Sequence, residues 1–137
     1  MKLFLDTGAF IAREKSDDKY HRAALTTFSD ITAGRLPYRR FYTSNFVLNE
    51  TVTLLLYRSG PTAAKEVLKR MRASPNLRIL PVTSEVEGRA DELFERFAQS
   101  RVSYTDCTSK ALMERESIDT AFSFDRDFRV LGCKVIP

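Results

Sequence analysis

Acidic residues stand where the expected strands of this chain end, and they are the side chains best suited to chemistry. Asp6 closes the first β-rich run, Asp125 directly follows the fourth, and Asp106 begins the helix that precedes that fourth run. In open α/β sheets the ligand crevice lies beyond the carboxyl ends of the strands, so we expect these acids to meet there. Each alone also fits a helix cap, and Ser103 with Asp106 forms an S-x-x-D capping box.

Glu50 is a fourth candidate because of its position on an expected helix. It shares a helical face with Phe46, Val47 and Leu54, at offsets of three and four residues. The periodicity therefore predicts that the Glu50 side chain points to the same side of the helix as these apolar residues. A buried, unpaired carboxylate costs several kcal/mol, so Glu50 should have a cation, a strong donor or a raised pKa.

Carboxylates that converge on one crevice repel one another, and some stay protonated unless a cation neutralises them. Apart from Cys107, which follows Asp106, no His or Cys stands near these acids, so the all-oxygen set favours Mg²⁺ or Mn²⁺ over zinc. Such a site can activate water for attack on phosphorus and stabilise the leaving oxygen. The acids therefore predict phosphodiester hydrolysis.

Other reactive side chains are few. The single histidine, His21, is interpreted as a solvated or packed side chain, and neither a Gly-rich phosphate loop nor a G-x-S-x-G elbow is present. Cys107 and Cys133 are far apart and have no CxxC spacing, which argues against a zinc site or a disulfide framework. A reducing, cytoplasmic location is expected.

Composition indicates one globular domain over residues 1–137, with 43% hydrophobic and 29% charged residues. The net charge of +4 favours polyanionic partners in a general way. Asp6 interrupts the first apolar run too early for a signal peptide, and no segment approaches about 18 uninterrupted apolar residues. No membrane association is expected.

Short β-rich runs alternate with longer helical patterns, which predicts an α/β domain with a mostly parallel, five-stranded sheet. Pro81 cannot donate a ladder hydrogen bond, so we expect the third strand to lie near a sheet edge or to end early. The expected strands cover residues 2–6, 40–44, 77–82, 120–124 and 134–136. The expected helices cover residues 7–14, 17–33, 45–59, 62–73, 84–98 and 105–116, with a turn or short helix at 125–130.

Four stretches carry the acids in a specific order: LFLDT at 3–7, SNFVLNET at 44–51, SYTDC at 103–107 and FSFDRDF at 122–128. Together they resemble the PIN-domain ribonucleases, and more narrowly the VapC-type toxins of prokaryotic toxin-antitoxin pairs. The resemblance covers nearly the whole chain. It implies a three-layer α/β/α sandwich with a central parallel sheet.

The resemblance also implies a set of metal-binding and catalytic acids that hold one or two Mg²⁺ or Mn²⁺ ions and orient the water that cuts RNA. These acids are Asp6, Glu50, Asp106 and Asp125. Asp127 is an alternative fourth ligand, or holds a water of the metal, but ranks behind Asp125. Thr7 and Ser123 match hydroxyl positions that help to place the acids.

Toxins of this kind commonly form homodimers and are silenced by a small antitoxin whose C-terminal segment crosses the active site. The first helices and the helix at 46–57 would supply much of the antitoxin groove. For the RNA itself, two groups of basic and aromatic residues could bind phosphates and stack on bases, or could simply be solvated faces. They are Arg35, Tyr38, Arg39, Arg40 and Tyr42, and then Arg58, Lys65, Lys69, Arg70 and Arg72.

Two other functions remain open from the sequence. One is a PIN-domain RNA-processing nuclease without an antitoxin. The other is a non-catalytic receiver-like module with an acidic pocket, although such a module needs a neighbouring acidic pair where Asp6 stands alone. A dehalogenase-type phosphatase is disfavoured because Gly8 occupies the position of its second Asp.

Overall fold

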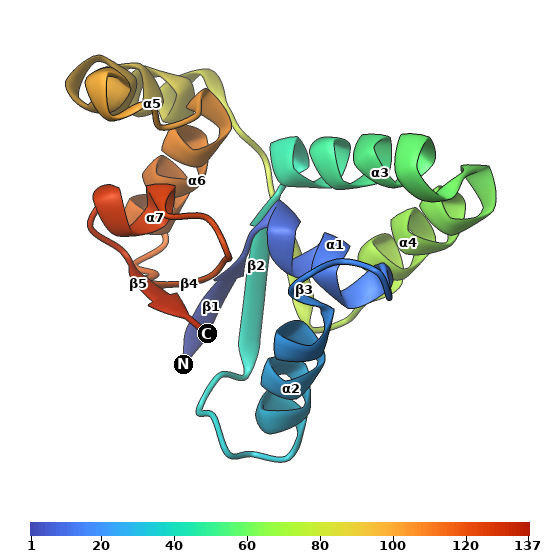
Figure 1. Cartoon of the computed structure of the whole chain (residues 1–137). Coiled ribbons are helices and arrows are strands. Elements are labelled where there is room, and N and C mark those ends of the chain that lie inside the picture. The colour runs from blue at the N-terminus through green and yellow to red at the C-terminus, as the bar shows by residue number, and fades with distance from the viewer.

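The computed structural model describes all residues from 1 to 137 and has a single sheet at its centre. Its five strands are all parallel, in the order β3-β2-β1-β4-β5 (Figure 1). They are β1 Lys2–Leu5, β2 Arg40–Ser44, β3 Leu77–Leu80, β4 Thr120–Phe122 and β5 Lys134–Ile136. Since every strand runs the same way, all five carboxyl ends lie along one edge of the sheet.

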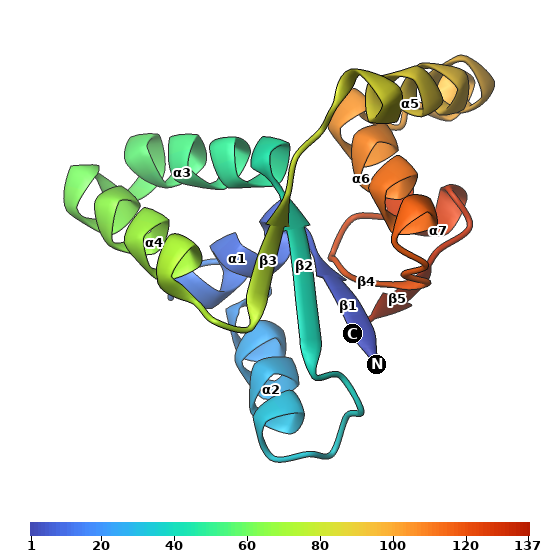
Figure 2. The ribbon, with the colours of Figure 1, turned by 180° about the vertical axis from the view of Figure 1, so that it is seen from behind.

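The helices form a layer on each side of this sheet, as Figures 1 and 2 show from opposite directions. The chain moves from β1 outward to β3 and then returns to β4, so right-handed crossovers place the later helices on the other face. One layer contains α1 Thr7–Glu14, α2 His21–Thr32, α3 Asn45–Ser59 and α4 Pro61–Ala73. The other contains α5 Ser84–Phe97, the 3-10 turn η1 Ala98–Ser100, α6 Tyr104–Arg115 and α7 Asp127–Val130.

The core lies on both faces of the central strands. Leu3 and Phe4 in β1 are fully buried, as expected for a parallel strand covered by helices on each side. The ring of Phe4 packs against Phe128 of α7, with centroids 6.4 Å apart. On the opposite face, Phe122 of β4 packs against Phe28 of α2 at 4.8 Å. These contacts hold the strand ends, and hence Asp6, in fixed positions.

The predicted fold class is confirmed: the molecule is a three-layer α/β/α sandwich around a parallel sheet, and β3 is an edge strand. The second helix begins at His21, later than expected, because Asp18 organises a turn before it. The Asp18 side chain accepts the Tyr20 N–H at 2.9 Å, and its carbonyl accepts the His21 N–H at 3.0 Å. None of the helices has the length and apolar character needed to span a bilayer.

Candidate active site

The carboxyl edge of the sheet opens into a cavity of about 640 Å³ that is lined by four of the five predicted acids, all except Asp127. Asp6, Glu50, Asp106 and Asp125 all line it, although 119 positions separate the first from the last by sequence number. Two buried aspartates form its floor, and two exposed acids border it. The parallel sheet thus brings together side chains from opposite ends of the chain.

Asp6 is buried at the junction between β1 and α1. Its backbone N–H donates to the carbonyl of Phe122 at 3.1 Å, which ties this junction to β4. The hydroxyl of Ser123 donates to Asp6 Oδ2 at 2.8 Å. Burial raises the pKa of Asp6 to about 6, even though the Ser123 hydrogen bond opposes this shift. The Asp6 carboxylate is therefore fixed in place, and a positive charge beside it would stabilise its ionised form.

Asp106 lies in the first turn of α6, where Ser103 caps the helix. The Ser103 hydroxyl accepts the Asp106 N–H at 3.0 Å, as the capping box predicts. Burial, followed by the charge of Asp6 and contact with Asp127, raises the pKa of Asp106 to about 9. Asp106 Oδ2 is buried and has no hydrogen-bond partner. Such an orphaned acceptor is costly unless a ligand satisfies it.

Asp125 and Asp127 lie in the turn between β4 and α7, and they differ in their surroundings. Asp125 is exposed, and its Oδ1 accepts the Asp127 N–H at 2.9 Å. Asp127 is buried, and its Oδ2 accepts the Ser103 N–H at 3.0 Å. Asp127 therefore also joins the α7 turn to the start of α6.

The donor set fits a hard divalent ion. One carboxylate oxygen from each of Asp106, Asp125 and Asp127 lies within 4.8 Å of the others. No imidazole or thiolate lines this cavity, and oxygen-only ligation is typical of Mg²⁺ and Mn²⁺. The unpartnered oxygen of Asp106 supplies an observation in favour of a bound cation.

The structure corrects the expectation that Glu50 is buried, because this side chain is exposed. The core face of α3 consists of Val47, Leu48, Thr51 and Leu55. Glu50 lies on the adjacent face, which borders the cavity, and its charge helps to raise the pKa of Asp6. The apolar residues three and four positions from Glu50 predicted a buried face of α3, but the rest of the protein covers this face only in part.

Three cations and an aromatic pair were missed as parts of this cavity. Lys19 and Arg126 line it together with Arg58, which was predicted only as part of a general basic group. Tyr20 and Phe124 form part of its wall. Arg126, between two candidate acids, is the residue that the sequence could have indicated; the turn that carries Lys19 and Tyr20 gave no such signal.

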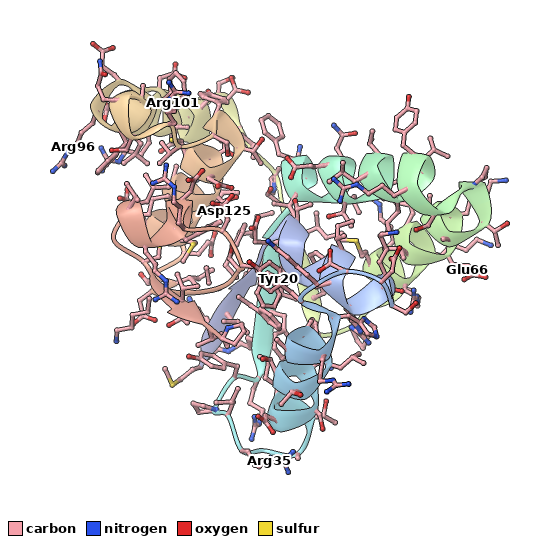
Figure 3. The ribbon with its side chains drawn as sticks, viewed as in Figure 1. Tyr20, Arg35, Glu66, Arg96, Arg101 and Asp125 are labelled. Atoms are coloured by element: carbon pink, nitrogen blue, oxygen red, sulfur yellow. The ribbon has the colours of Figure 1, made fainter.

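The first predicted RNA-binding group is wrong as a stacking surface. Tyr38 and Tyr42 are buried in the core, so neither can receive a base. Arg35 pairs with Asp30 at 2.7 Å, and Figure 3 shows it at the far end of the molecule from Asp125. Burial of these tyrosines follows from their position before and within β2, which lies in the interior of the sheet.

Comparisons with known proteins agree with this geometry. The PIN-domain family matches residues 3–132, almost the entire chain. This chain belongs to the PIN-domain family. The 23S rRNA-specific endonuclease VapC20 of Mycobacterium tuberculosis is 35% identical over 130 residues, covering 95% of this chain and 94% of VapC20.

A second relative and a crystal structure of VapC20 agree with this PIN-domain assignment. A VapC ribonuclease of Archaeoglobus fulgidus is 30% identical over 129 residues, covering 93% of this chain and 80% of the relative. The crystal structure of M. tuberculosis VapC20, described as a Sarcin-Ricin loop cleaving toxin, superposes with a TM-score of 0.87. That match has 33% identity and covers 98% of this chain and 99% of the other. The predicted VapC-like resemblance is therefore confirmed.

Proposed function

We propose that this PIN domain is a divalent-metal-dependent endoribonuclease of the VapC type, which hydrolyses RNA phosphodiester bonds. The observation that carries the proposal is the buried, unpartnered oxygen of Asp106 among acids from three separate segments. Nuclease activity is also the named function of its two relatives. We further propose that residues 1–137 act as one nuclease domain.

Asp6, Glu50, Asp106 and Asp125 would hold Mg²⁺ or Mn²⁺, and Asp127 would complete the set or place Asp125. A bound ion of this kind activates water for attack on phosphorus and stabilises the charge that develops on the phosphate. The protein's own contribution is rigid placement of the acids. Ser123 positions Asp6 and also accepts the Asp125 N–H at 3.0 Å, so one hydroxyl aligns two of the acids.

Basic side chains at the same cavity would bind the RNA backbone. Lys19, Arg58 and Arg126 come from three different segments and surround the acids. Contacts of Lys and Arg with phosphates position a nucleic acid without reading its sequence. These cations offset repulsion between the phosphates and the acidic cavity. Their placement supports a polyanionic substrate.

We extend two further properties to this chain. The substrate is proposed to be a loop of ribosomal RNA, since the relative VapC20 is named as specific for 23S rRNA. The partner is proposed to be a small antitoxin protein, since VapC20 is described as a toxin. A homodimer and a cytoplasmic location complete the proposal, and the two unpaired cysteines support a reducing compartment. Light scattering would measure the dimer.

The decisive experiment compares RNA cleavage by wild-type protein and Asp106→Asn in Mg²⁺, Mn²⁺ and EDTA. Cleavage should require the metal, and Asp106→Asn should lower it by at least about 100-fold because a ligand oxygen is lost. Asp119→Asn is the matched control, since Asp119 is exposed beside Lys134 at the opposite end of β4. Full activity in EDTA or in Asp106→Asn would contradict the proposal.

A further inference from the structure

Two parallel aromatic rings form part of the wall of the acidic cavity. The rings of Tyr20 and Phe124 stack with centroids 4.5 Å apart and planes inclined by 4°. Both residues line the cavity, and Phe124 immediately precedes Asp125. Tyr20 is 37% exposed even though it is aromatic. Figure 3 shows Tyr20 near the middle of the molecule, and Asp125 on the neighbouring segment.

Phe124 is held from behind by a continuous row of aromatic side chains. Its ring meets Phe122 edge to face at 5.9 Å, and Phe122 packs in turn against Phe28 at 4.8 Å. Phe122 is fully buried. The Phe124 ring is therefore fixed by the core and offers Tyr20 a rigid support.

Tyr20 is held by the turn that precedes α2. Its N–H donates to Asp18 Oδ1 at 2.9 Å. The next residue, His21, bonds through Nδ1 to the carbonyl of Ala12 at 2.7 Å, which fastens the start of α2 to α1. The Tyr20 backbone is thus anchored on both sides. Only its ring projects toward the cavity.

The long, exposed side chain of Lys19 also contacts the Tyr20 ring. Phe124 occupies one face, so Lys19 Nζ, 4.8 Å from the ring centroid, lies over the other. Lys19 is exposed on a flexible stem. A cation over an exposed ring is held more weakly than a stacked base. An incoming base can therefore displace Lys19, whose ammonium group remains available for a phosphate.

We propose that Tyr20, supported by Phe124, is a stacking platform for an unpaired RNA base next to the phosphate that is cut. The inference rests on the proposed ribonuclease function and adds a positioning residue to it. Aromatic stacking of unpaired bases is a general mode of single-stranded RNA recognition. Here the platform, the acids and three cations share one cavity. A substrate with an unpaired nucleotide beside the cut is the chemistry that this arrangement fits.

The test uses a fluorescein-labelled RNA hairpin that the wild-type enzyme cuts at one mapped loop position. Binding is measured in the non-cleaving Asp106→Asn background, with Mg²⁺ present. Adding Tyr20→Ala should weaken binding about tenfold, as expected for loss of one stacked base, whereas Tyr20→Phe should bind normally. In the active enzyme Tyr20→Ala should raise KM and leave kcat nearly unchanged. Tyr57→Ala is the control, because Tyr57 is 83% exposed and does not line this cavity.

A second arm separates base stacking by Tyr20 from a purely structural role of this residue. Abasic nucleotides are placed one at a time beside the cut. One position should weaken binding to a protein with Tyr20 but have no effect in Tyr20→Ala, since the base and the ring act as a pair. A purely structural role of Tyr20 would not produce this dependence.

Several results would overturn the platform while leaving the nuclease intact. They are unchanged KM in Tyr20→Ala, equal losses in Tyr20→Ala and Tyr20→Phe, or no abasic position that depends on Tyr20. Normal RNA binding by Tyr20→Ala with weaker inhibition by the antitoxin would show a protein contact instead, and would also refute the inference. Absence of any metal-dependent cleavage by wild-type protein would instead count against the proposed function.

Discussion

Ser123 connects two of the acids at the site. Its hydroxyl donates to Asp6 and accepts from the Asp125 backbone, and the side chain is buried. We expect Ser123→Ala to raise the Mg²⁺ concentration needed for half-maximal cleavage by about 10- to 100-fold, as for other partners that orient metal ligands. A Mg²⁺ titration of the cleavage rate measures this shift. Thr32→Ala, which removes a hydroxyl bound within α2, should cause no shift; equal Mg²⁺ requirements in both variants would refute the role of Ser123.

The sequence could predict that some of the acids lie at one edge of the sheet, because their positions depend on where the strands end. Asp6 and Asp106 required only the strand pattern and the capping box. The burial of Glu50 was predicted wrongly, since periodicity identifies a helical face but not what covers it. The different surroundings of Asp125 and Asp127 depend on how the turn after β4 folds, which is a tertiary property. The assignment of the ligands stays a prediction until a metal-binding measurement tests it.

Helix α6 illustrates how an element can place one functional side chain. We expect Ser103→Ala to lower the free energy of unfolding by about 1 kcal/mol, the usual cost of losing an N-cap. Cleavage should also fall, because the cap sets the first turn that carries Asp106. Denaturant unfolding and cleavage rates measure the two effects. Normal cleavage in a destabilised Ser103→Ala would show that the cap does not position Asp106.

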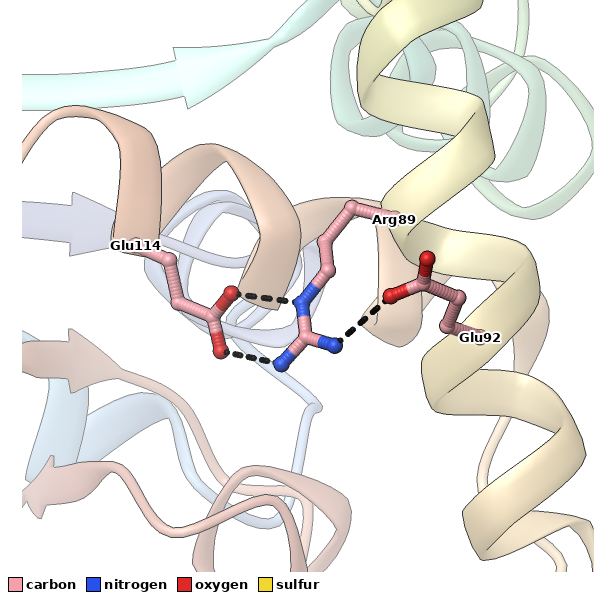
Figure 4. A network of polar contacts seen from close by, with 3 residues as sticks. All are labelled: Arg89, Glu92 and Glu114. Carbon is pink, nitrogen blue, oxygen red and sulfur yellow. Dashed lines mark hydrogen bonds and ion pairs between the residues drawn. The ribbon is translucent and has the colours of Figure 1, made fainter.

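An ion pair between α5 and α6 offers a control for the Ser103→Ala experiment. Arg89 of α5 donates to both oxygens of Glu114 in α6, at 2.9 and 3.2 Å, and to Glu92 at 3.0 Å (Figure 4). The Arg89 and Glu114 side chains are 45% and 35% exposed. Exposed pairs contribute about 0–1 kcal/mol, so Arg89→Ala should cost less than about 1 kcal/mol and leave cleavage unchanged.

Elements were predictable to different degrees. Strand β2, helix α3 and strand β5 have the expected bounds. For α3 the reason is local, because its apolar residues and the Gly60-Pro61 stop are signals within the segment itself. The start of α2 was misplaced, since Asp18 uses its side chain to make a turn where a cap was expected. Strands β3 and β4 end earlier than expected, before Pro81 and before Ser123, where the chain turns toward the site.

At the scale of the whole molecule, the buried acids couple stability to pH. The pKa of Asp106 is about 9 in the folded protein against 3.8 for an ordinary aspartate, and that of Asp6 is about 6. The folded protein therefore binds more protons, and its metal-free stability should fall as the pH rises from about 4 to about 9. Mg²⁺ should restore stability most at the high end of this range.

Thermal unfolding at pH 5, 7 and 9, in EDTA and in Mg²⁺, measures this coupling. In EDTA, the melting temperature of Asp106→Asn should fall less steeply with pH than that of the wild type, because the substitution removes the main titrating group. Mg²⁺ should also raise the melting temperature of this variant less. Asp119→Asn should behave like wild type. A melting temperature that rises with pH in EDTA, or an equal gain from Mg²⁺ at pH 5 and pH 9, would contradict this prediction.

The central position of β1 between β2 and β4 has a consequence for synthesis of the protein. Asp6 is synthesised 100 or more residues before its partners Asp106, Ser123 and Asp125. A growing chain without β4 and Ser123 lacks one of the two strands that pair with β1 and the hydroxyl that orients Asp6. A chain that has not yet formed β4 therefore lacks the complete set of acids, and the site can assemble only after residue 125 has been added.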